Sequence, residues 1–392
     1  MKQRLDGLAV FRELLKDGAV AAFRELLQDC CRNDADNFVS HCGEFESLLF
    51  QQSDCWTAYL RRAVMESENV CIRNWASGAV TAVQEECLNR ELAFLDRLSQ
   101  VTLYDLTAGL DHAPDFLVGW RTEGGSIAQD YRQRMQEVGE KGYGIFARYH
   151  MFTVENGQLV PVKHPDPQQL EQLPGYEQER QKVIANTQAL LDGKPANNVL
   201  LYGDAGTGKS SAIKAIANNF AEQGLRLVEV KKNQLYQIPD LMDALAANPL
   251  KFILFIDDLS FTSNDDNFAA LKAILEGSVG GRAQNIAVYA TSNRRHLIKE
   301  TMTDRSGDDI HESDTRQELM SLSARFGLTV TFASPDRDRY LYIVGELAKQ
   351  YGVDLDEHTL AVRSEAFAIR MGGRSARVAK QFIELCKSGV QV

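Results

Sequence analysis

The sequence predicts an α/β fold in which a parallel sheet lies between helices, preceded by a mostly α-helical N-terminal region and a β-hairpin. Three observations support this prediction. Between residues 199 and 332, short apolar runs alternate with segments of helical periodicity, as expected for buried parallel strands and their crossover helices. The first of these runs leads into a glycine-rich turn. Residues 1–145 instead carry apolar residues at helical spacing.

Residues 1–145 are expected to form a helical domain. Leu8, Phe11 and Leu15 recur at a spacing that makes an apolar stripe, and residues 80–98 continue the helical pattern with a charged opposite face. No pattern in this region indicates a chemistry. We therefore expect this domain to bind a protein partner or to support assembly.

The cysteines favour a reduced protein without a zinc ribbon. Six of the seven lie between Cys30 and Cys87, and none forms a C-x₂-C pair. We expect free thiols packed in helices. A metal site made of Cys30, Cys31, His41 and Cys42 is the alternative, but this spacing fits no common metal-binding pattern.

Residues 146–168 are expected to form a β-hairpin and a linker. Apolar residues change there from helical to strand-like spacing, and Asn156-Gly157 favours a tight turn. Pro161 suits an edge strand, because proline cannot donate to a sheet. Prolines then punctuate the polar stretch 165–174, so we place the start of the next domain at residue 169.

A glycine-rich turn at residues 203–211 matches the pattern G-x-x-x-x-G-K-[ST] without a mismatch. Its glycines let backbone N–H groups surround phosphates, Lys209 reaches the outer phosphates, and the Ser210 hydroxyl can bind Mg²⁺. The helix that follows adds its positive N-terminal end. The expected phosphate-binding residues are Gly203, Asp204, Ala205, Gly206, Thr207, Gly208, Lys209, Ser210 and Ser211.

Two consecutive carboxylates, Asp257 and Asp258, follow the apolar run at residues 252–256. Such a pair beside a phosphate loop suits Mg²⁺ chemistry: Asp257 would hold the metal's water shell, and Asp258 would orient the attacking water. The alternative is that the pair starts a loop or caps a helix. The position of the pair after Lys209 in the chain favours the catalytic interpretation.

Asn293 follows another predicted strand, residues 286–291. The C-terminal end of a parallel strand opens onto the ligand crevice, so the Asn293 amide is placed to hold a water or to contact a γ-phosphate. Turn formation is the alternative role. Arg294-Arg295 comes next in the chain.

Arg325 immediately precedes a strand-like run at residues 328–332, after a charge-dense insert at residues 299–319. Its permanent planar charge makes it a candidate arginine finger acting on a γ-phosphate of another subunit. A surface salt bridge is the alternative.

Size and charge narrow the classes of function. The chain has 392 residues, enough for two or three domains with cores, and a net charge of −11. This charge argues against a surface that generally coats nucleic acid, although a local basic groove remains compatible with it. The charged N-terminus and the lack of an 18-residue apolar run argue against secretion and membrane spanning. We expect a cytoplasmic enzyme.

Together these elements resemble the AAA+ ATPases over residues 170–387. In that resemblance, Gly203 to Ser210 is Walker A, Phe252 to Asp258 is Walker B, Asn293 is sensor 1, and the arginine finger is Arg325. The chain looks particularly like an uncharacterised family of bacterial AAA+ proteins known only by a domain of unknown function. The resemblance implies an AAA+ P-loop three-layer αβα domain at residues 169–335.

The resemblance also extends to both ends of this domain. Gly175 and Tyr176 match the start of the family's adenine-side segment. Arg377 takes the sensor 2 position as the preferred phosphate contact, with Arg374 as the fallback. Residues 336–392 are expected to form the C-terminal helical lid. The helices predicted there are Asp336 to Tyr351, Asp356 to Arg370 and Arg374 to Lys387.

ATP and Mg²⁺ are the cofactors that the resemblance implies. The family's usual Walker B motif ends in Asp-Glu, whereas this chain has Asp257-Asp258, as in the initiator and helicase-loader branch, so we expect modest hydrolysis. If Arg325 acts on a neighbouring subunit, ATP favours a ring or spiral; a hexamer is the family's usual number. Tyr236 lies where threading ATPases place an aromatic pore loop, but a core tyrosine at a helix start is equally natural.

Three hypotheses about function follow. The first is an oligomeric AAA+ ATPase that remodels or switches a protein partner bound by the N-terminal domain. The second is a nucleic-acid ATPase of helicase-loader or initiator type, suggested by Asp257-Asp258 and Arg294-Arg295; nucleic acid is therefore the less favoured partner. The third is a non-hydrolysing, nucleotide-gated scaffold of a stress or defence complex. A small-molecule kinase leaves Asn293, Arg325 and the lid unexplained.

Overall fold

The computed structural model describes residues 1–108, 110, 115–259, 267–276, 283–293 and 324–390. The chain divides into two compact units, Met1–Arg148 and Tyr149–Val392. Each unit has a hydrophobic core of its own. Among the described residues, no helix combines the length and the apolar character needed to cross a bilayer.

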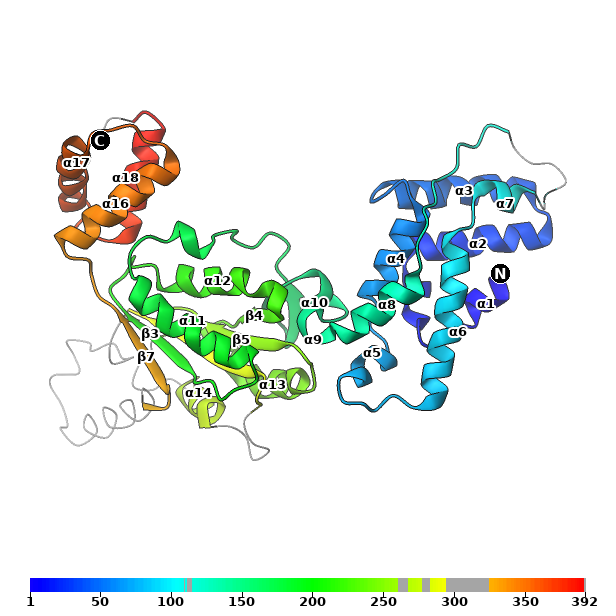
Figure 1. Ribbon diagram of the computed structural model, residues 1–392, viewed down its shortest axis with the longest axis horizontal. Helices are drawn as coiled ribbons and strands as arrows, with labels where there is room; N and C mark the ends of the chain where they lie inside the picture. Colours follow the sequence, from blue (N-terminus) through cyan, green and yellow to red (C-terminus); the bar gives the residue numbers. More distant parts are fainter. Residues whose placement is uncertain (109, 111–114, 260–266, 277–282, 294–323, 391–392) are drawn as a thin grey trace. The chain divides into compact units, whose positions relative to one another are not determined.

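The first unit is helical, as predicted (Figure 1). Phe23 and Trp56 stack at 4.7 Å in the centre of its core, and Phe45 packs edge-on against both rings. The Trp56 indole N–H donates to the Leu98 carbonyl at 3.0 Å, so the buried ring leaves no polar atom unpaired. The elements are α1 (Lys2–Asp6), 3-10 helix η1 (Arg12–Lys16), α2 (Gly18–Arg32), α3 (Ala35–Phe50), α4 (Trp56–Glu66), α5 (Val70–Trp75), α6 (Ala82–Ser99), α7 (Leu103–Thr107), α8 (Ile127–Gln136), α9 (Val138–Lys141) and α10 (Ile145–Arg148).

The buried carboxylate of Glu91 ties the start of the chain to α6. It accepts backbone N–H bonds from Ala9 at 2.6 Å, Val10 at 3.2 Å and Phe11 at 2.9 Å. These three donors precede η1 and lack partners within a helix, so the carboxylate satisfies groups that would otherwise be buried unpaired.

All seven cysteines are free thiols, as expected from the sequence. Within the described part of the chain, no group of three or more His, Cys, Asp or Glu side chains is arranged to hold a metal ion. The alternative metal site around His41 therefore does not form there. His41 Nδ1 lies 2.7 Å from Oδ2 of Asp29, a buried carboxylate on the neighbouring helix α2.

The second unit is built on a sheet that, in the described residues, has seven strands in the order β2-β1-β4-β5-β6-β3-β7. The pairing is parallel except between β1 and β2. Every residue of β6 is buried, as expected for a central strand covered on both faces. The strands are β1 (Met151–Glu155), β2 (Gln158–Pro161), β3 (Val199–Gly203), β4 (Leu225–Glu229), β5 (Lys251–Ile256), β6 (Ile286–Ser292) and β7 (Leu328–Phe332).

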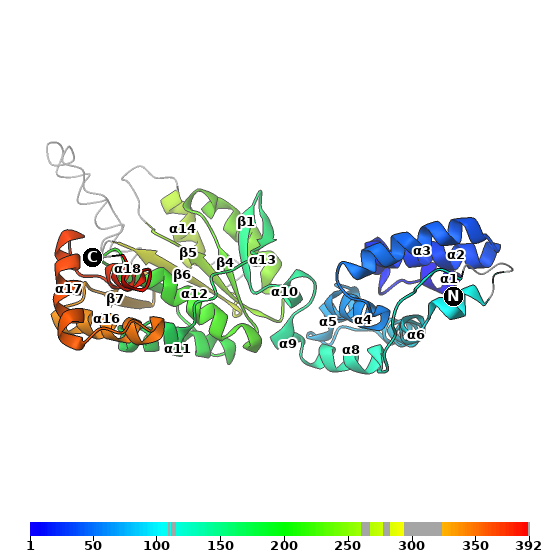
Figure 2. The same cartoon turned by 90° about the horizontal axis from the view of Figure 1, so that it is seen from above.

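Helices cover both faces of this sheet. Figure 2 shows α11 and α12 on one side of the strands and α13 and α14 on the other. This is the predicted α/β architecture. The elements are η2 (Leu170–Gln172), α11 (Glu177–Leu191), α12 (Lys209–Asn219), η3 (Ala221–Gln223), η4 (Lys232–Gln237), α13 (Ile238–Ala246) and α14 (Asn267–Glu276).

The predicted hairpin forms, but it belongs to the sheet. Asn156 and Gly157 both have positive φ, 50° and 77°, as a tight hairpin turn requires. Met151 pairs in parallel with Leu227, so β1 and β2 extend the parallel sheet rather than standing apart from it. Pro161 lies on the edge strand β2, where its missing N–H costs nothing.

Three helices at the C-terminus form the predicted lid: α16 (Arg337–Tyr351), α17 (Glu357–Arg370) and α18 (Ala376–Lys387). They pack on one another through contacts among all three pairs. Asp336, Asp356 and Ser375 each cap one of them by accepting a backbone N–H bond from three residues ahead. Each helix starts one or two residues later than predicted, because the cap residue itself is not helical.

Candidate nucleotide site

The glycine-rich loop follows β3, which lies between β6 and β7. Strands on either side of β3 come later in the chain, and such a switch point is where α/β sheets open a crevice for ligands. Gly203 has a φ of 142°, and a Cβ there would lie 1.9 Å from the Phe332 carbonyl oxygen on β7. The loop can therefore leave the sheet in this direction only with glycine at position 203.

Lys209 is buried at the start of α12, with 6% of its surface exposed. Its ammonium donates to the carbonyl oxygens of Gly203 and Asp204, both at 2.8 Å, and to Asn293 Oδ1 at 3.1 Å. Burial lowers the pKa of Lys209, while the charges of Asp204, Asp258 and Asp257 act in the opposite direction. All three donors of the ammonium are thus engaged within the loop region.

Asp257 lies at the C-terminal end of β5, beside the start of α12. Its Oδ1 accepts hydrogen bonds from Ser210 Oγ at 2.6 Å and from Thr291 Oγ1 at 2.5 Å. A hydroxyl and a carboxylate side by side are the hard oxygen ligands that Mg²⁺ prefers, in the small number that leaves room for phosphates and waters. The residues present therefore fit a Mg²⁺ ion held by Ser210 and Asp257.

Asp258 adopts a left-handed conformation, with a φ of 50°. Its backbone N–H donates to Thr291 Oγ1 at 2.9 Å, and its Oδ1 accepts from Asn293 Nδ2 at 2.8 Å. A left-handed aspartate is uncommon and costs free energy, which here is offset by these bonds. The predicted catalytic carboxylate and the predicted sensor 1 amide are thus in direct contact.

The lid reaches the loop through the start of α18. The Arg377 backbone N–H donates to the Gly206 carbonyl at 3.0 Å, and the positive charge of Arg377 contributes to lowering the pKa of Lys209. Arg374 instead forms a two-bond ion pair with Glu365, at 2.7 and 2.9 Å. The structure therefore places Arg377, rather than the fallback Arg374, beside the phosphate loop.

Gly175 and Tyr176 lie before α11 with positive φ, 78° and 61°. Tyr176 is buried, its ring stacks on Phe332 at 5.2 Å, and its hydroxyl donates to the Ala333 carbonyl at 2.7 Å. Burial raises the pKa of Tyr176 to about 12. The tyrosine therefore stays neutral and braces the chain after β7, with the Arg339 guanidinium 4.9 Å from its ring centre.

Arg325 lies far from the loop of its own chain. β7 starts beside Val199 and ends beside Gly203, and Arg325 precedes its N-terminal end. At about 3.3 Å per residue, β7 alone separates its two ends by roughly 13 Å. Arg325 is half-buried near the N-terminal end of β7, whereas the loop lies at the C-terminal end of the parallel strands.

Two further predictions from the sequence concern Tyr236 and the charged stretch that follows Asn293. Tyr236 lies in η4 with 67% of its surface exposed, so it is not a core tyrosine. Arg294-Arg295 and the insert at 299–319 lie outside the described residues.

Thr291 and Ser334 are site residues that sequence reasoning missed. Thr291 joins Asp257 to the Asp258 backbone, and Ser334 donates to Asp204 through both its backbone N–H, at 2.9 Å, and its hydroxyl, at 2.7 Å. The bonds from Ser334 lower the pKa of Asp204. A polar residue at the end of an apolar strand was a usable signal for Thr291, whereas no local pattern marks Ser334.

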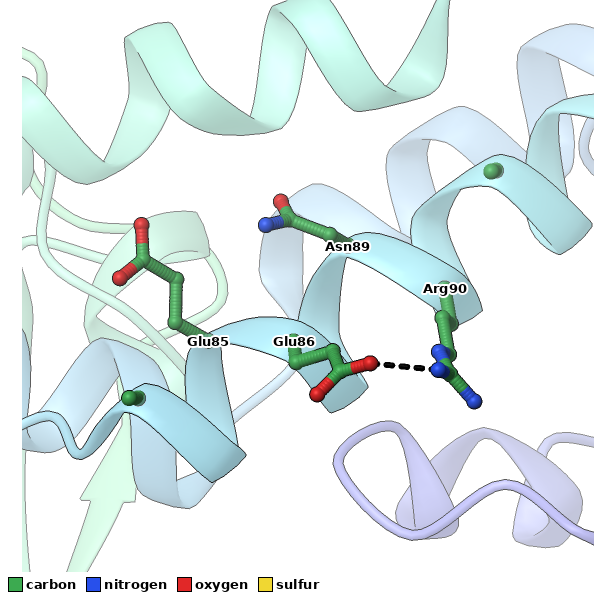
Figure 3. Close-up of a pocket in the computed structure, with 6 residues that line it drawn as sticks. Glu85, Glu86, Asn89 and Arg90 are labelled. Atoms are coloured by element: carbon green, nitrogen blue, oxygen red, sulfur yellow. Dashed lines mark hydrogen bonds and ion pairs between the residues drawn. The ribbon is translucent and has the colours of Figure 1, made fainter.

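A hollow of about 450 Å³ on the first unit offers no comparable site (Figure 3). All its lining residues belong to the single helix α6, and Glu86 and Arg90 point toward each other in an ion pair. The hollow is an open helix surface rather than a convergent pocket.

The sheet, the glycine-rich loop with its carboxylates, and the helical lid have the arrangement of the AAA+ class. The family model described as "Protein of unknown function (DUF815)" matches residues 146–390, and the chain belongs to this family. The resemblance predicted from the sequence is thereby confirmed. No curated protein matches the chain.

Several solved structures are similar to this chain. One RuvB variant from Thermotoga maritima aligns with a TM-score of 0.38 and 18% identity, covering 57% of this chain and 66% of that one. Another RuvB variant from the same organism aligns with a TM-score of 0.38 and 18% identity, covering 55% and 63%. The FIGL-1 AAA domain in complex with ADP aligns with a TM-score of 0.39 and 18% identity, covering 55% and 72%. The chain thus spans just under two thirds of the length of these two RuvB chains.

Proposed function

We propose that this protein binds ATP with Mg²⁺ and hydrolyses it slowly, in order to switch or remodel a protein partner. One observation carries the proposal: hydrogen bonds run without a break from Ser210 through Asp257, Thr291 and Asp258 to Asn293 and Lys209. This network supports the proposal because two oxygen groups suited to Mg²⁺, a candidate general base and a lysine suited to phosphate meet at one end of the sheet.

Each residue of the network has a distinct role in the proposed reaction. Lys209 holds the outer phosphates, and Ser210 and Asp257 hold Mg²⁺, which neutralises charge on the phosphates when bound. Asp258 orients the attacking water and accepts its proton at a carboxylate oxygen, while Asn293 fixes that carboxylate by the 2.8 Å bond. Aspartate is one methylene shorter than the usual glutamate, which supports slow turnover.

We propose that the complete site needs a second copy of the chain. Arg325 lies near the N-terminal end of β7, away from its own loop at the C-terminal end of β3, so its guanidinium serves a neighbouring subunit. ATP binding then favours a ring or spiral of identical subunits, with a hexamer as the working number.

The N-terminal unit is the proposed partner-binding part. It has a separate core, and the family match begins only at residue 146. A protein partner in the cytoplasm fits the free thiols, and the net charge of −11 favours protein over nucleic acid.

Hydrolysis and assembly test the proposal together. We expect the full chain to release phosphate from ATP only with Mg²⁺, at a low rate, and to gain mass when ATP is added. Capture with the Asp258→Asn variant in ATP, but not in ADP, should retain a protein partner. A chain that neither binds ATP nor changes its mass with ATP contradicts the proposal.

A further inference from the structure

We infer that Asp204 is a positioning residue that couples the phosphate loop to the hinge of the helical lid through Ser334. The inference rests on the proposed ATP binding. It adds a regulatory contact that the loop motif itself does not contain, since position 204 is a variable position of G-x-x-x-x-G-K-[ST].

Ser334 lies in the short segment between β7 and α16, so it is part of the chain that carries the lid. Both of its donors converge on one atom, Asp204 Oδ2, at 2.9 Å from the backbone nitrogen and 2.7 Å from the hydroxyl. Hydrogen bonds to a carboxylate are about twice as strong as neutral ones. Asp204 and Ser334 are both exposed, so water competes and the contact can open.

The residues around Ser334 restrict the conformation of the hinge, residues 333–336. Gly203 approaches the Phe332 carbonyl too closely for any side chain, and Tyr176 donates to the Ala333 carbonyl. Pro335 holds its own φ near −65° and keeps Ser334 out of the helical region. If Ser334 moves, the restricted hinge cannot change its own conformation to compensate, and the start of α16 therefore moves with it.

Asp204 also takes part in the resting arrangement of the loop. Its carbonyl accepts from Lys209 Nζ at 2.8 Å and from Thr207 Oγ1 at 2.9 Å. The Lys209 ammonium has three N–H donors, and all three are engaged. It can therefore donate to a phosphate only if it gives up a present acceptor, such as the Asp204 carbonyl. Phosphate binding therefore acts on the same residue that holds the hinge.

The lid is attached to the loop at a second point. Arg377 on α18 donates its backbone N–H to the Gly206 carbonyl at 3.0 Å. One loop of four consecutive residues, 203–206, thus contacts the hinge before α16 and the start of α18. With both attachments in place, a change in the loop shifts the lid, and the reciprocal effect of lid position on nucleotide affinity follows from linkage.

Hydrogen exchange of α16 in the full chain, with and without a non-hydrolysable ATP analogue and Mg²⁺, tests this coupling. In the wild type we expect the analogue to change exchange in α16 by roughly three- to tenfold, the range of one or two hydrogen bonds. Measured at saturating analogue, Asp204→Ala should remove most of this change, because it removes the acceptor of both bonds, whereas Ser334→Ala keeps the backbone bond and should remove about half of it. Ser388→Ala is the matched control, because its hydroxyl bonds to Leu385 within the lid and away from the loop.

A double-mutant cycle separates coupling from a merely structural role. Asp204→Ala should have a larger effect than Ser334→Ala, and adding Ser334→Ala to Asp204→Ala should add nothing further, because the acceptor of both bonds is already gone. If Asp204→Ala lowers thermal stability but keeps the nucleotide-dependent change in α16, the inference is wrong. It is also wrong if wild type binds the analogue without any change in α16. If wild type does not bind the analogue at all, the proposed function fails, and the inference fails with it.

Discussion

The side-chain amide of Asn293 donates to Asp258 Oδ1 at 2.8 Å. Its other end accepts from Lys209 at 3.1 Å. One amide therefore lies between the group proposed to hold phosphate and the group proposed to activate water. Five predictions follow from this site and from the N-terminal unit, each with its measurement.

Lys209→Ala should weaken ATP binding by about 100-fold or more, because two or three charge-assisted hydrogen bonds to phosphate are lost. Titration with a fluorescent ATP analogue measures this. Lys214→Ala is the matched control, since Lys214 lies on the same helix but pairs with Glu229 at 3.2 Å. Equal losses in both variants would indicate damage to α12 rather than loss of a phosphate contact.

Asp258→Asn should keep ATP binding and lower the hydrolysis rate by about 10² to 10⁴, the usual contribution of a general base. The asparagine can still accept the bond from Asn293, so the local structure should persist. Single-turnover assays and mass measurement should show an ATP-bound assembly that does not decay. Rapid turnover in this variant would remove Asp258 from the mechanism.

Arg325→Ala should spare ATP binding and lower turnover by about 10³ to 10⁵, as for other arginine fingers. Mixing this variant with Lys209→Ala distinguishes a contact between subunits. Arg325 of the Lys209→Ala chain can then complete the intact loop of the Arg325→Ala chain, so the mixture should hydrolyse ATP although each variant alone is inactive. Arg363→Ala, an exposed arginine of α17, should behave as wild type. An inactive mixture that still assembles contradicts the contact between subunits.

Thr291→Val should raise the Mg²⁺ concentration required for ATP binding by about tenfold, because Asp257 loses one of its charge-assisted hydrogen bonds. Nucleotide titrations at several Mg²⁺ concentrations measure the shift. Thr331→Val, at an exposed position of β7, is the control. Unchanged Mg²⁺ dependence in Thr291→Val would mean that the bonds from Ser210 and from the Asp258 backbone are enough to position Asp257.

The His41–Asp29 contact should make the N-terminal unit more stable at acidic than at alkaline pH. The hydrogen bond to Asp29 raises the pKa of His41 above its ordinary 6.5. A raised pKa gives a contribution that is complete below about pH 6.5 and is lost as the pH rises through the folded-state value. Urea unfolding followed by tryptophan fluorescence reports this unit, since all three tryptophans precede residue 149. His41→Asn should lose most of the difference between wild-type curves at about pH 6 and about pH 7.5, a range below the pKa of unfolded thiols, and a full persistent difference would exclude His41 as its source.

The sequence predicts the parallel strands and the lid helices well, because their signals are local. β5 is an apolar run that ends at Asp257-Asp258, and α16 starts at a capping aspartate. The pairing of Met151 with Leu227 was not predictable in this way. An isolated hairpin and a hairpin on the edge of a larger sheet have the same local pattern, and only long-range packing distinguishes them.

The site residues likewise divide into those with a local sequence signal and those placed by long-range contacts. Lys209, Asp257 and Asn293 could be assigned because each follows a predicted strand or a glycine loop. The choice between Arg377 and Arg374 depends on Glu365, which engages Arg374 from the preceding helix. Ser334 contributes through a contact with Asp204 across 130 positions of sequence, which no short pattern can show.

The two separate hydrophobic cores affect how this protein can change by recombination during evolution. One core is built from residues between Leu5 and Tyr143, and the other from residues between Met151 and Ile383. The family match begins at residue 146, between them. Recombination at this point leaves both cores intact, so a lineage can exchange the helical N-terminal unit and inherit the α/β unit and its loop unaltered.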